Sequence, residues 1–192
     1  MALVLRQISA ASEEPLNLQE VKQFLRVDHN DDDNLILGLI TVARERAENI
    51  THRALITQTW QLYLDDWPNE DYIELPYPPL QGVVSVYYVD YEGTATLWAA
   101  TNYDEDVYIE PGRLMLAYGI EWPTVTLDVG SAIRVQYTCG YGTPDDVPIE
   151  LKHAMKLHIA DLYEMRTTYT KENVGRIGVA EQLYMPWRIF SF

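Results

Sequence analysis

The densest group of possible metal ligands in the chain is the heptapeptide DHNDDDN, with four aspartates and two asparagines. An EF-hand loop opens with oxygen ligands at its first, third and fifth positions, and Asp28, Asn30 and Asp32 fit them. The loop also needs glycine at the sixth position and a bidentate glutamate at the twelfth. The chain has Asp33 and Leu39 there. Because both departures fall where Ca²⁺ geometry is strict, the pattern argues against an EF-hand.

The same acids suit the start of a helix. Apolar residues follow at the i, i+3, i+4, i+7 spacing of one helix face: Leu35, Ile36, Leu39, Ile40, Ala43, Ala47 and Ile50. Acidic side chains at a helix N-terminus accept hydrogen bonds from free N–H groups and complement the helix dipole. We therefore predict that Asp31, Asp32 and Asp33 cap and charge a helix after a turn at residues 28–30. A weak cation site is the alternative.

The other titratable residues form no pattern typical of catalysis. The chain has no G-x-S-x-G, P-loop or H-E-x-x-H motif, and no cysteine pair. A hydrolase acting on sugars needs two carboxylates about 5 to 9 Å apart across a cleft, and Asp104 or Asp106 could supply an acid. His158 and Asp161 could pair on a helix, although a histidine at the edge of the core is favoured. We predict no catalytic residue, no metal and no cofactor.

Composition limits the class of protein. The 192 residues are 47% hydrophobic and 11% aromatic, as in a packed globular protein. No apolar run reaches the roughly 18 to 20 residues of a membrane span, and the N-terminus lacks the basic start of a secretory signal. The single cysteine, Cys139, excludes an internal disulfide and suits a reducing compartment. We therefore expect neither a membrane partner nor secretion.

Negative charge is concentrated in the middle of the chain. Residues 58–142 hold 13 acids and only two bases, so they carry −11 of the total net charge of −15. Such a segment repels nucleic acid instead of binding it. Solubility alone is an equally simple explanation of the charge.

Residues 1–57 and 143–192 are predicted to be helical. Asn17 is a suitable N-cap for a first helix, and Glu20 three residues later completes a capping box. In the C-terminal part, Asp145 or Asp146 precedes a run with helical periodicity, and a short helix is expected from about residue 179 to 185.

Residues 58–142 change to the alternating pattern of strands. The seven candidate strands are TQTWQLYLD, YIEL, VVSVYYVD, TATLWA, VYIE, RLMLAY and AIRVQYT. A Glu-Gly pair at residues 92–93 predicts a hairpin between two of them. We therefore predict an α+β fold in which residues 1–57 and 143–192 complete one helical core. The acidic antiparallel β-rich segment 58–142 is inserted between them.

The C-terminal tail is the most concentrated apolar segment without periodicity. Beyond Pro186 it contains Trp187, Arg188, Ile189, Phe190 and Phe192. Aromatic side chains of this kind often anchor protein interfaces. The tail is a candidate docking segment for a partner, with folding back onto its own core as the alternative.

The chain resembles a known family over most of its length, from about residue 15 to 192. The resemblance rests on LRVDHNDDDNLI, ARERAE followed by RALITQTW, ELPYPPLQGV, and the GYG and VP segments near residues 140–148. These patterns are similar to the head–tail connector (neck adaptor) proteins of tailed bacteriophages and prophages, in the version with a β-rich insertion. One departure is His52, at a position where glycine is common. Glycine suits a helix end, so only the local helix stop is affected.

The resemblance implies a structural function. Such proteins form a ring of about a dozen copies beneath the portal protein, extend the DNA channel and bind a stopper or tail-completion protein. It implies a place in the virion neck, with assembly in the bacterial host cytoplasm, and no sequence-specific binding of nucleic acid. Acidic, non-adhesive channel walls agree with the charge of residues 58–142. The alternatives are a binding module with a tyrosine-rich sheet and the hydrolase considered above.

Overall fold

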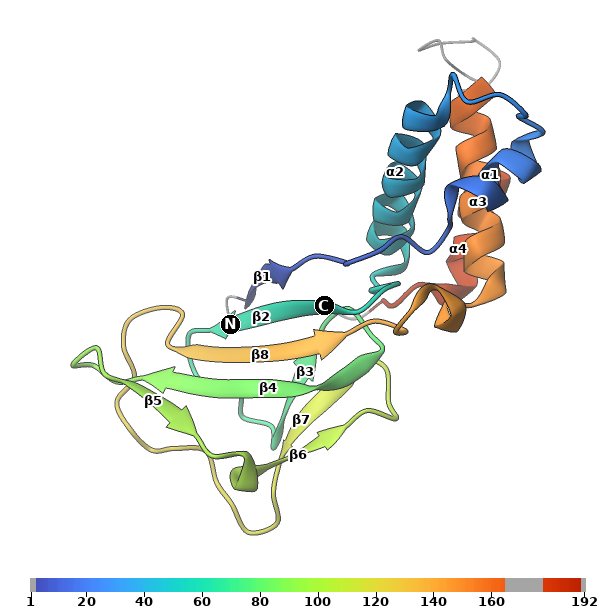
Figure 1. Ribbon diagram of the computed structural model, residues 1–192. Coiled ribbons are helices and arrows are strands. Elements are labelled where there is room, and N and C mark those ends of the chain that lie inside the picture. The colour runs from blue at the N-terminus through green and yellow to red at the C-terminus, as the bar shows by residue number, and fades with distance from the viewer. Residues whose placement is uncertain (1–2, 165–177, 191–192) are drawn as a thin grey trace. The chain divides into compact units, whose positions relative to one another are not determined.

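The computed structural model describes residues 3–164 and 178–190 (Figure 1). Its strands are β1 (Leu3–Ser9), β2 (Gln58–Leu64), β3 (Tyr72–Leu75), β4 (Leu80–Val89), β5 (Ala95–Trp98), β6 (Tyr103–Asp106), β7 (Gly112–Leu116) and β8 (Ile133–Cys139). Its helices are α1 (Leu18–Leu25), α2 (Asp33–Thr51), α3 (Ile149–Glu164) and α4 (Val179–Tyr184), with 3₁₀ turns η1 (Ala100–Asn102), η2 (Pro144–Asp146) and η3 (Met185–Trp187). The fold is α+β, as predicted.

The described residues form two compact units. The β-unit contains residues 3–12 and 57–140, and the helical unit contains residues 13–56, 141–164 and 178–190. Strand β1 therefore belongs with the sheets, whereas the sequence pattern predicts that all of residues 1–57 lie in the helical core. The strand was missed because neither of its faces is buried, so its sequence LVLRQIS lacks the usual alternation.

The β-unit consists of two antiparallel sheets. One has the strand order β1-β2-β8-β4-β5 and the other β3-β7-β6. Strand β8 lies in the centre of the larger sheet, so alternate side chains, including Ile133, Val135 and Tyr137, are completely buried. The predicted hairpin is confirmed: β4 pairs with β5, and Gly93 has a φ of 83° in the turn.

One predicted strand is wrong. The run VYIE at residues 107–110 is a turn, and the strand lies earlier, at β6. The backbone N–H of Tyr108 donates to the Asp106 carboxylate at 3.1 Å, which turns the chain after the strand. The acidic sequence YDED concealed β6 because aspartate is uncommon in strands.

The ELPYPPLQGV motif joins the two sheets of the β-unit, from the end of β3 to the start of β4. The Tyr137 hydroxyl donates to the carbonyl of Pro76 at 3.0 Å, and Tyr77 stacks on Trp60 with ring centroids 4.4 Å apart. At Gly112, a Cβ would lie 2.4 Å from the Cβ of Leu80, so only glycine fits beside this crossing. The motif thus has a packing role in the β-unit.

The helical unit has one apolar core. Helix α2 buries Ile36, Ile40, Ala43 and Ala47 at the spacing of one helix face. Helix α3 buries Leu151, Ala154, Met155 and Ile159. Leu35 of the predicted α2 face is instead exposed. No helix in the described residues is long and apolar enough to cross a membrane.

Two helix ends of this unit follow from their sequences. Asn17 caps α1: its Oδ1 accepts from the Glu20 N–H at 2.9 Å, and the Glu20 carboxylate accepts from the Asn17 N–H at 3.2 Å. Helix α2 ends at His52, which has a left-handed φ of 54°. Glycine adopts this conformation most readily, so the helix stops here in the way that a C-terminal glycine would allow.

Candidate functional site

The aspartate-rich heptapeptide holds a lysine side chain. The Lys22 ammonium donates to Asn30 Oδ1 at 2.7 Å and to Asp33 Oδ1 at 2.6 Å. The cation that these oxygens bind therefore comes from helix α1 of the same unit. Among the described residues, no group of three or more histidine, cysteine or acidic side chains could hold a metal ion.

The predicted capping of α2 by this heptapeptide is only partly correct. Asp33 lies in the first turn, where its charge complements the helix dipole. Asp32 occupies the N-cap position, but its side chain makes no capping hydrogen bond and instead accepts from the Tyr163 hydroxyl of α3. Asp31 is exposed and lies 3.8 Å from His29. A tertiary contact with α3 thus replaces the local cap at Asp32, and periodicity cannot reveal such a contact.

The acids considered for a hydrolase lie side by side on β6. Asp104 and Asp106 are two residues apart, so they project from the same face of one strand. Glycosidase carboxylates must instead face each other across the bond that is cleaved. Between them, Glu105 accepts a hydrogen bond from the backbone N–H of Val83 at 3.0 Å, which is a structural role at the edge of β4.

His158 lies half-buried on α3, and its Nδ1 atom is buried without a hydrogen-bond partner. Burial, and then the charge of Arg46, lower the pKa of this imidazole, while Asp161 and Glu181 act in the opposite direction. Asp161, the possible partner on the helix, raises the pKa only through its charge, and the environment as a whole favours the neutral imidazole.

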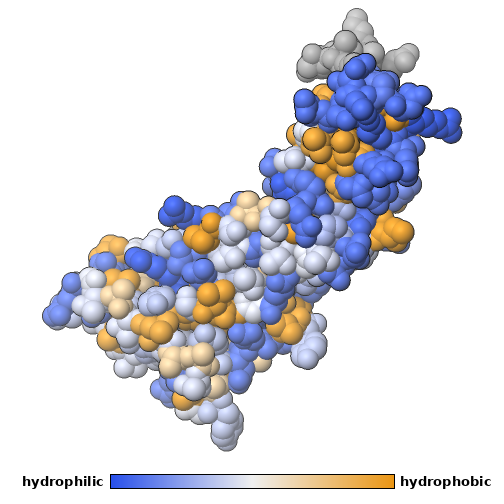
Figure 2. All heavy atoms as spheres, in the orientation of Figure 1, coloured by the Kyte–Doolittle hydropathy of each residue, from blue (hydrophilic) through white to orange (hydrophobic). Residues whose placement is uncertain are grey.

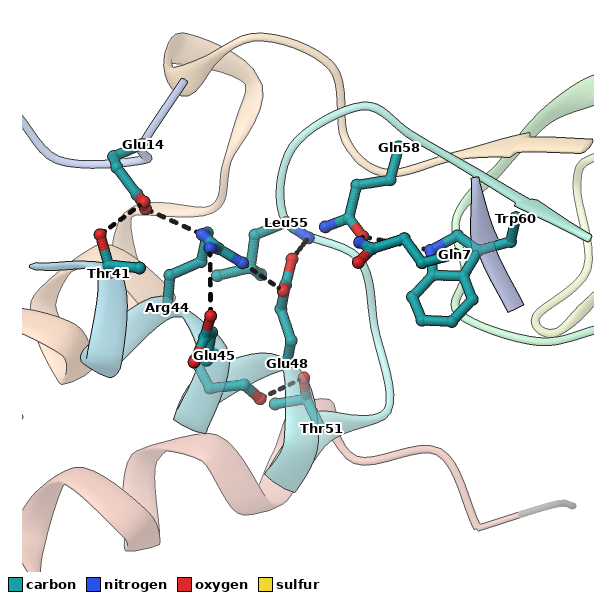
Figure 3. Close-up of polar contacts among 11 residues, drawn as sticks. Gln7, Glu14, Thr41, Arg44, Glu45, Glu48, Thr51, Leu55, Gln58 and Trp60 are labelled. Carbon is teal, nitrogen blue, oxygen red and sulfur yellow. Dashed lines mark hydrogen bonds and ion pairs between the residues drawn. The ribbon is translucent and has the colours of Figure 1, made fainter. Parts of the chain in front are cut away.

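The most connected charged cluster is centred on Arg44 of α2 (Figure 3). Its guanidinium donates to Glu14 and to Glu48, each at 2.8 Å. Burial alone would lower the pKa of Arg44, but the charges and hydrogen bonds of Glu48 and Glu14 raise it overall. Glu14 also accepts from the Thr41 hydroxyl, and Glu48 accepts from the Leu55 N–H at 2.9 Å. The cluster therefore ties residues 14 and 55 to the same helix.

The C-terminal tail contacts its own helical unit as far as Ile189. The Trp187 carbonyl accepts from Arg53 Nε at 2.6 Å, and the Trp187 indole N–H donates to Glu150 at 3.2 Å. The Ile189 N–H donates to the Thr51 carbonyl at 3.0 Å. In contrast, the Phe190 side chain is 83% exposed.

These positions divide the predicted docking segment. Trp187 and Ile189 are engaged within the chain, which is the alternative that the sequence left open. Arg188 lies against Phe190, 5.3 Å from its ring centroid. Phe192 lies outside the described residues. Docking to a partner is therefore a proposal for Arg188 and Phe190 alone.

The β-unit contains an aromatic cluster that sequence reasoning missed. Trp67 stacks on Trp122 with ring centroids 4.8 Å apart, and the ring centroid of Trp98 lies 5.5 Å from that of Trp67 and 5.3 Å from that of Trp122. Trp98 also stacks on Tyr103, whose pKa is raised by burial. These residues are distant in sequence, so no local pattern relates them. Their packing holds the long segment between β7 and β8 against the sheets.

Comparison with known proteins relates the chain to one family. Residues 15–109 match the family described as "Phage gp6-like head-tail connector protein". The solved structures that resemble the chain include proteins of gene transfer agent particles, matched over 98% of this chain. A chain in "Neck of empty GTA particle computed with C6 symmetry" has a TM-score of 0.80 and 24% identity, with 97% of it covered. Together, the family match and these structures support a head–tail connector protein.

Two further solved structures agree with this assignment. A chain in "Virion of native gene transfer agent (GTA) particle" has a TM-score of 0.79, 25% identity and 96% coverage. A chain in "Neck of native GTA particle computed with C12 symmetry" has a TM-score of 0.78, 24% identity and 97% coverage. None of the curated proteins matches the sequence significantly. The family match supports a structural role for this protein as a head–tail connector.

Both units of the connector expose hydrophobic residues on the face in Figure 2. On the β-unit, Val4 of β1 and Leu97 of β5 are exposed on edge strands. Tyr91, Tyr108 and Tyr118 are exposed in its loops. Tyrosines are frequent at protein interfaces, so this unit offers several places for a partner to bind.

Proposed function

We propose that this connector assembles into a ring of about a dozen copies beneath the portal protein, where it extends the DNA channel and joins the head to the tail. The observation that carries the proposal is the similarity over 98% of the chain to a protein of a neck computed with C12 symmetry. The family match of residues 15–109 supports the same role.

The partners in this proposal are the portal protein on the head side and a stopper or tail-completion protein on the tail side. The connector occupies the virion neck and assembles in the host cytoplasm. DNA passes through the ring without sequence-specific contacts. An exposed, apolar Phe190 beside Arg188 supports the tail as one of the docking segments.

The charge of the β-unit supports the passage of DNA. Residues 1–12 and 57–140 contain 13 acids and three bases, which is a net charge of −10. An acidic wall repels the phosphates of DNA, so the duplex slides past without adhering. Basic walls would instead retain the DNA, because lysine and arginine side chains neutralise its phosphates and release their counterions.

Mass photometry of the purified connector, alone and mixed with its portal protein, tests the proposal. We expect a species of about twelve copies whose population grows with protein concentration or appears on the portal. Electron microscopy of the mixture should show additional density coaxial with the portal ring. A connector that stays monomeric at every concentration, and that leaves the portal unchanged, would overturn the proposal.

A further inference from the structure

The larger sheet of the β-unit has two open edges. In the order β1-β2-β8-β4-β5, strands β1 and β5 each pair on one side only within the described chain. An unpaired edge presents N–H and C=O groups that can bind another strand, and proteins usually protect it with charges, proline or a covering segment. Strand β5 covers only residues 86–89 of β4. The earlier, open part of β4 is protected by a charge, because the Glu105 carboxylate accepts from the Val83 N–H.

Strand β1 lacks such protection. Its sequence LVLRQIS contains one charge, and Leu3, Val4 and Ile8 are 45%, 52% and 46% exposed. Beside it, Leu3 lines an open, mainly apolar hollow with Leu62 and Leu64 of β2 and Ile73 of β3. At the other edge of the sheet, Leu97 of β5 is 56% exposed. Both edges therefore offer apolar side chains as well as backbone groups.

The strand register links the two edges. One row of directly opposed residues crosses all five strands, in the order Val4, Tyr63, Arg134, Tyr87 and Leu97. Directly opposed residues share a face of the sheet, so Val4 and Leu97 are the two apolar ends of one row.

The adjacent row lies on the opposite face of the same sheet. It runs through Leu5, Leu62, Val135, Val86 and Trp98, and its last four members are buried. If β5 of one copy lay beside β1 of another, Leu97 would meet Val4 and Trp98 would meet Leu5. Apolar pairs would then continue on both faces of the sheet.

Charge favours pairing of unlike edges. The only charge on β1 is Arg6, whereas Glu92 lies in the turn before β5 and Glu105 lies at the open part of β4. Two β5 edges brought together would place like charges near each other, and an Arg6 edge against an acidic edge would not. A contact between unlike edges is heterologous, which is the type that closes rings.

We propose that the occupant of the β1 edge is a second copy of this chain, which adds its β5 edge so that the five-stranded sheet continues from subunit to subunit. This inference rests on the proposed ring. In an antiparallel sheet of five strands the first and last run in the same direction. Neighbouring copies in a ring of about twelve differ by a small rotation, so β5 and the next β1 pair in parallel.

A charge-swap experiment on the full-length connector tests this contact. Leu97→Asp places a charge where Val4 of the next copy should lie, and Val4→Lys does the same from the other side. We expect each single variant to reduce the ring population at a given concentration at least tenfold, measured by mass photometry. The double variant Val4→Lys with Leu97→Asp should restore most of it, because the two charges face each other. Val129→Asp, in an exposed loop, is the control and should assemble like the wild type.

Cysteine cross-linking distinguishes the geometry. Under oxidation, Val4→Cys with Leu97→Cys should give a ladder of covalent species larger than dimers on a non-reducing gel. Val4→Cys alone should remain uncross-linked. A dimer from Val4→Cys alone would indicate two β1 edges in contact and overturn the proposal.

The outcomes also separate this inference from the ring itself. If all the variants, shown to be folded by circular dichroism, form rings as well as the wild type, the edge contact is wrong and the ring remains. If the wild type forms no ring, even on its portal, both proposals fall.

Discussion

At the scale of single residues, the charged side chains of the helical unit have structural roles. Arg44 is only 9% exposed and is held between Glu14 and Glu48, whereas Arg46, two residues along the same helix, makes an exposed ion pair with Glu181. A buried charge that loses its partners costs far more than a surface charge does. The two arginines therefore form a matched pair for an experiment.

We expect Arg44→Ala to lower the free energy of unfolding by about 2 to 4 kcal/mol, because Glu14 and Glu48 lose their counter-charge. Arg46→Ala should lower it by less than about 1 kcal/mol. Urea unfolding followed by circular dichroism measures both values. Equal losses for the two variants would contradict the structural role of the Arg44 cluster.

His158 makes the stability of the helical unit depend on pH. Burial and the Arg46 charge lower its pKa, so the folded protein binds a proton less readily than the unfolded chain does. The stability contributed by the neutral imidazole is therefore present above the unfolded pKa of about 6.5, and it is lost as the pH falls through the folded pKa. We expect His158→Leu to show a smaller fall in melting temperature than the wild type between pH 7 and pH 5.5.

His29→Gln is the control for this measurement, because His29 is exposed. It should follow the wild-type profile, since acids that titrate at lower pH affect both proteins alike. A His158→Leu profile parallel to the wild type would exclude His158 as the cause.

At the scale of elements, we propose that the tail beyond Pro186 both stabilises the helical unit and docks on a partner. Trp187 lies against Arg53 and Glu150, and Phe190 extends into solvent. We expect Trp187→Ala to destabilise the helical unit by about 1 to 2 kcal/mol, through the loss of its ring contact and hydrogen bond. Phe190→Ala should leave the melting temperature unchanged and weaken docking on the portal or growth of the ring.

Thermal melts and portal-binding assays on the same two variants separate these roles. Loss of stability in Phe190→Ala would assign that side chain to the connector's own core. Unchanged docking in a folded Phe190→Ala would remove it from the interface.

At the scale of the whole molecule, the chain folds as two units with different charge. The helical unit brings together residues that flank the β-unit in sequence. Arg53 donates to the Tyr141 hydroxyl at 3.3 Å, and both residues lie near the points, at residues 56 and 141, where the chain leaves and re-enters this unit. We expect a chain in which a short Gly/Ser linker joins residue 56 to residue 141 to fold into the helical unit, with a helical spectrum and a cooperative melt. A non-cooperative melt of this chain would show that the helical unit needs the β-unit to fold.

Local sequence patterns predict the elements whose side chains form one buried and one exposed face. The α2 and α3 faces, the Asn17 cap and the β4–β5 hairpin all follow from short-range periodicity and turn chemistry. The motif resemblance supplied the connector family as well, because packing patterns such as ELPYPPLQGV are local in sequence.

Tertiary structure decided whatever depends on residues far apart in the chain. Strand β1 is held by pairing with the distant strand β2, and its own sequence carries no buried face. Asp32 accepts from Tyr163 of α3 and so does not cap its own helix. Trp187 donates to Glu150 of α3 and so is not free to bind a partner. The row from Val4 to Leu97 exists only through the register of five strands. Long-range pairing is chosen by the free energy of the whole fold, and no window of sequence contains it.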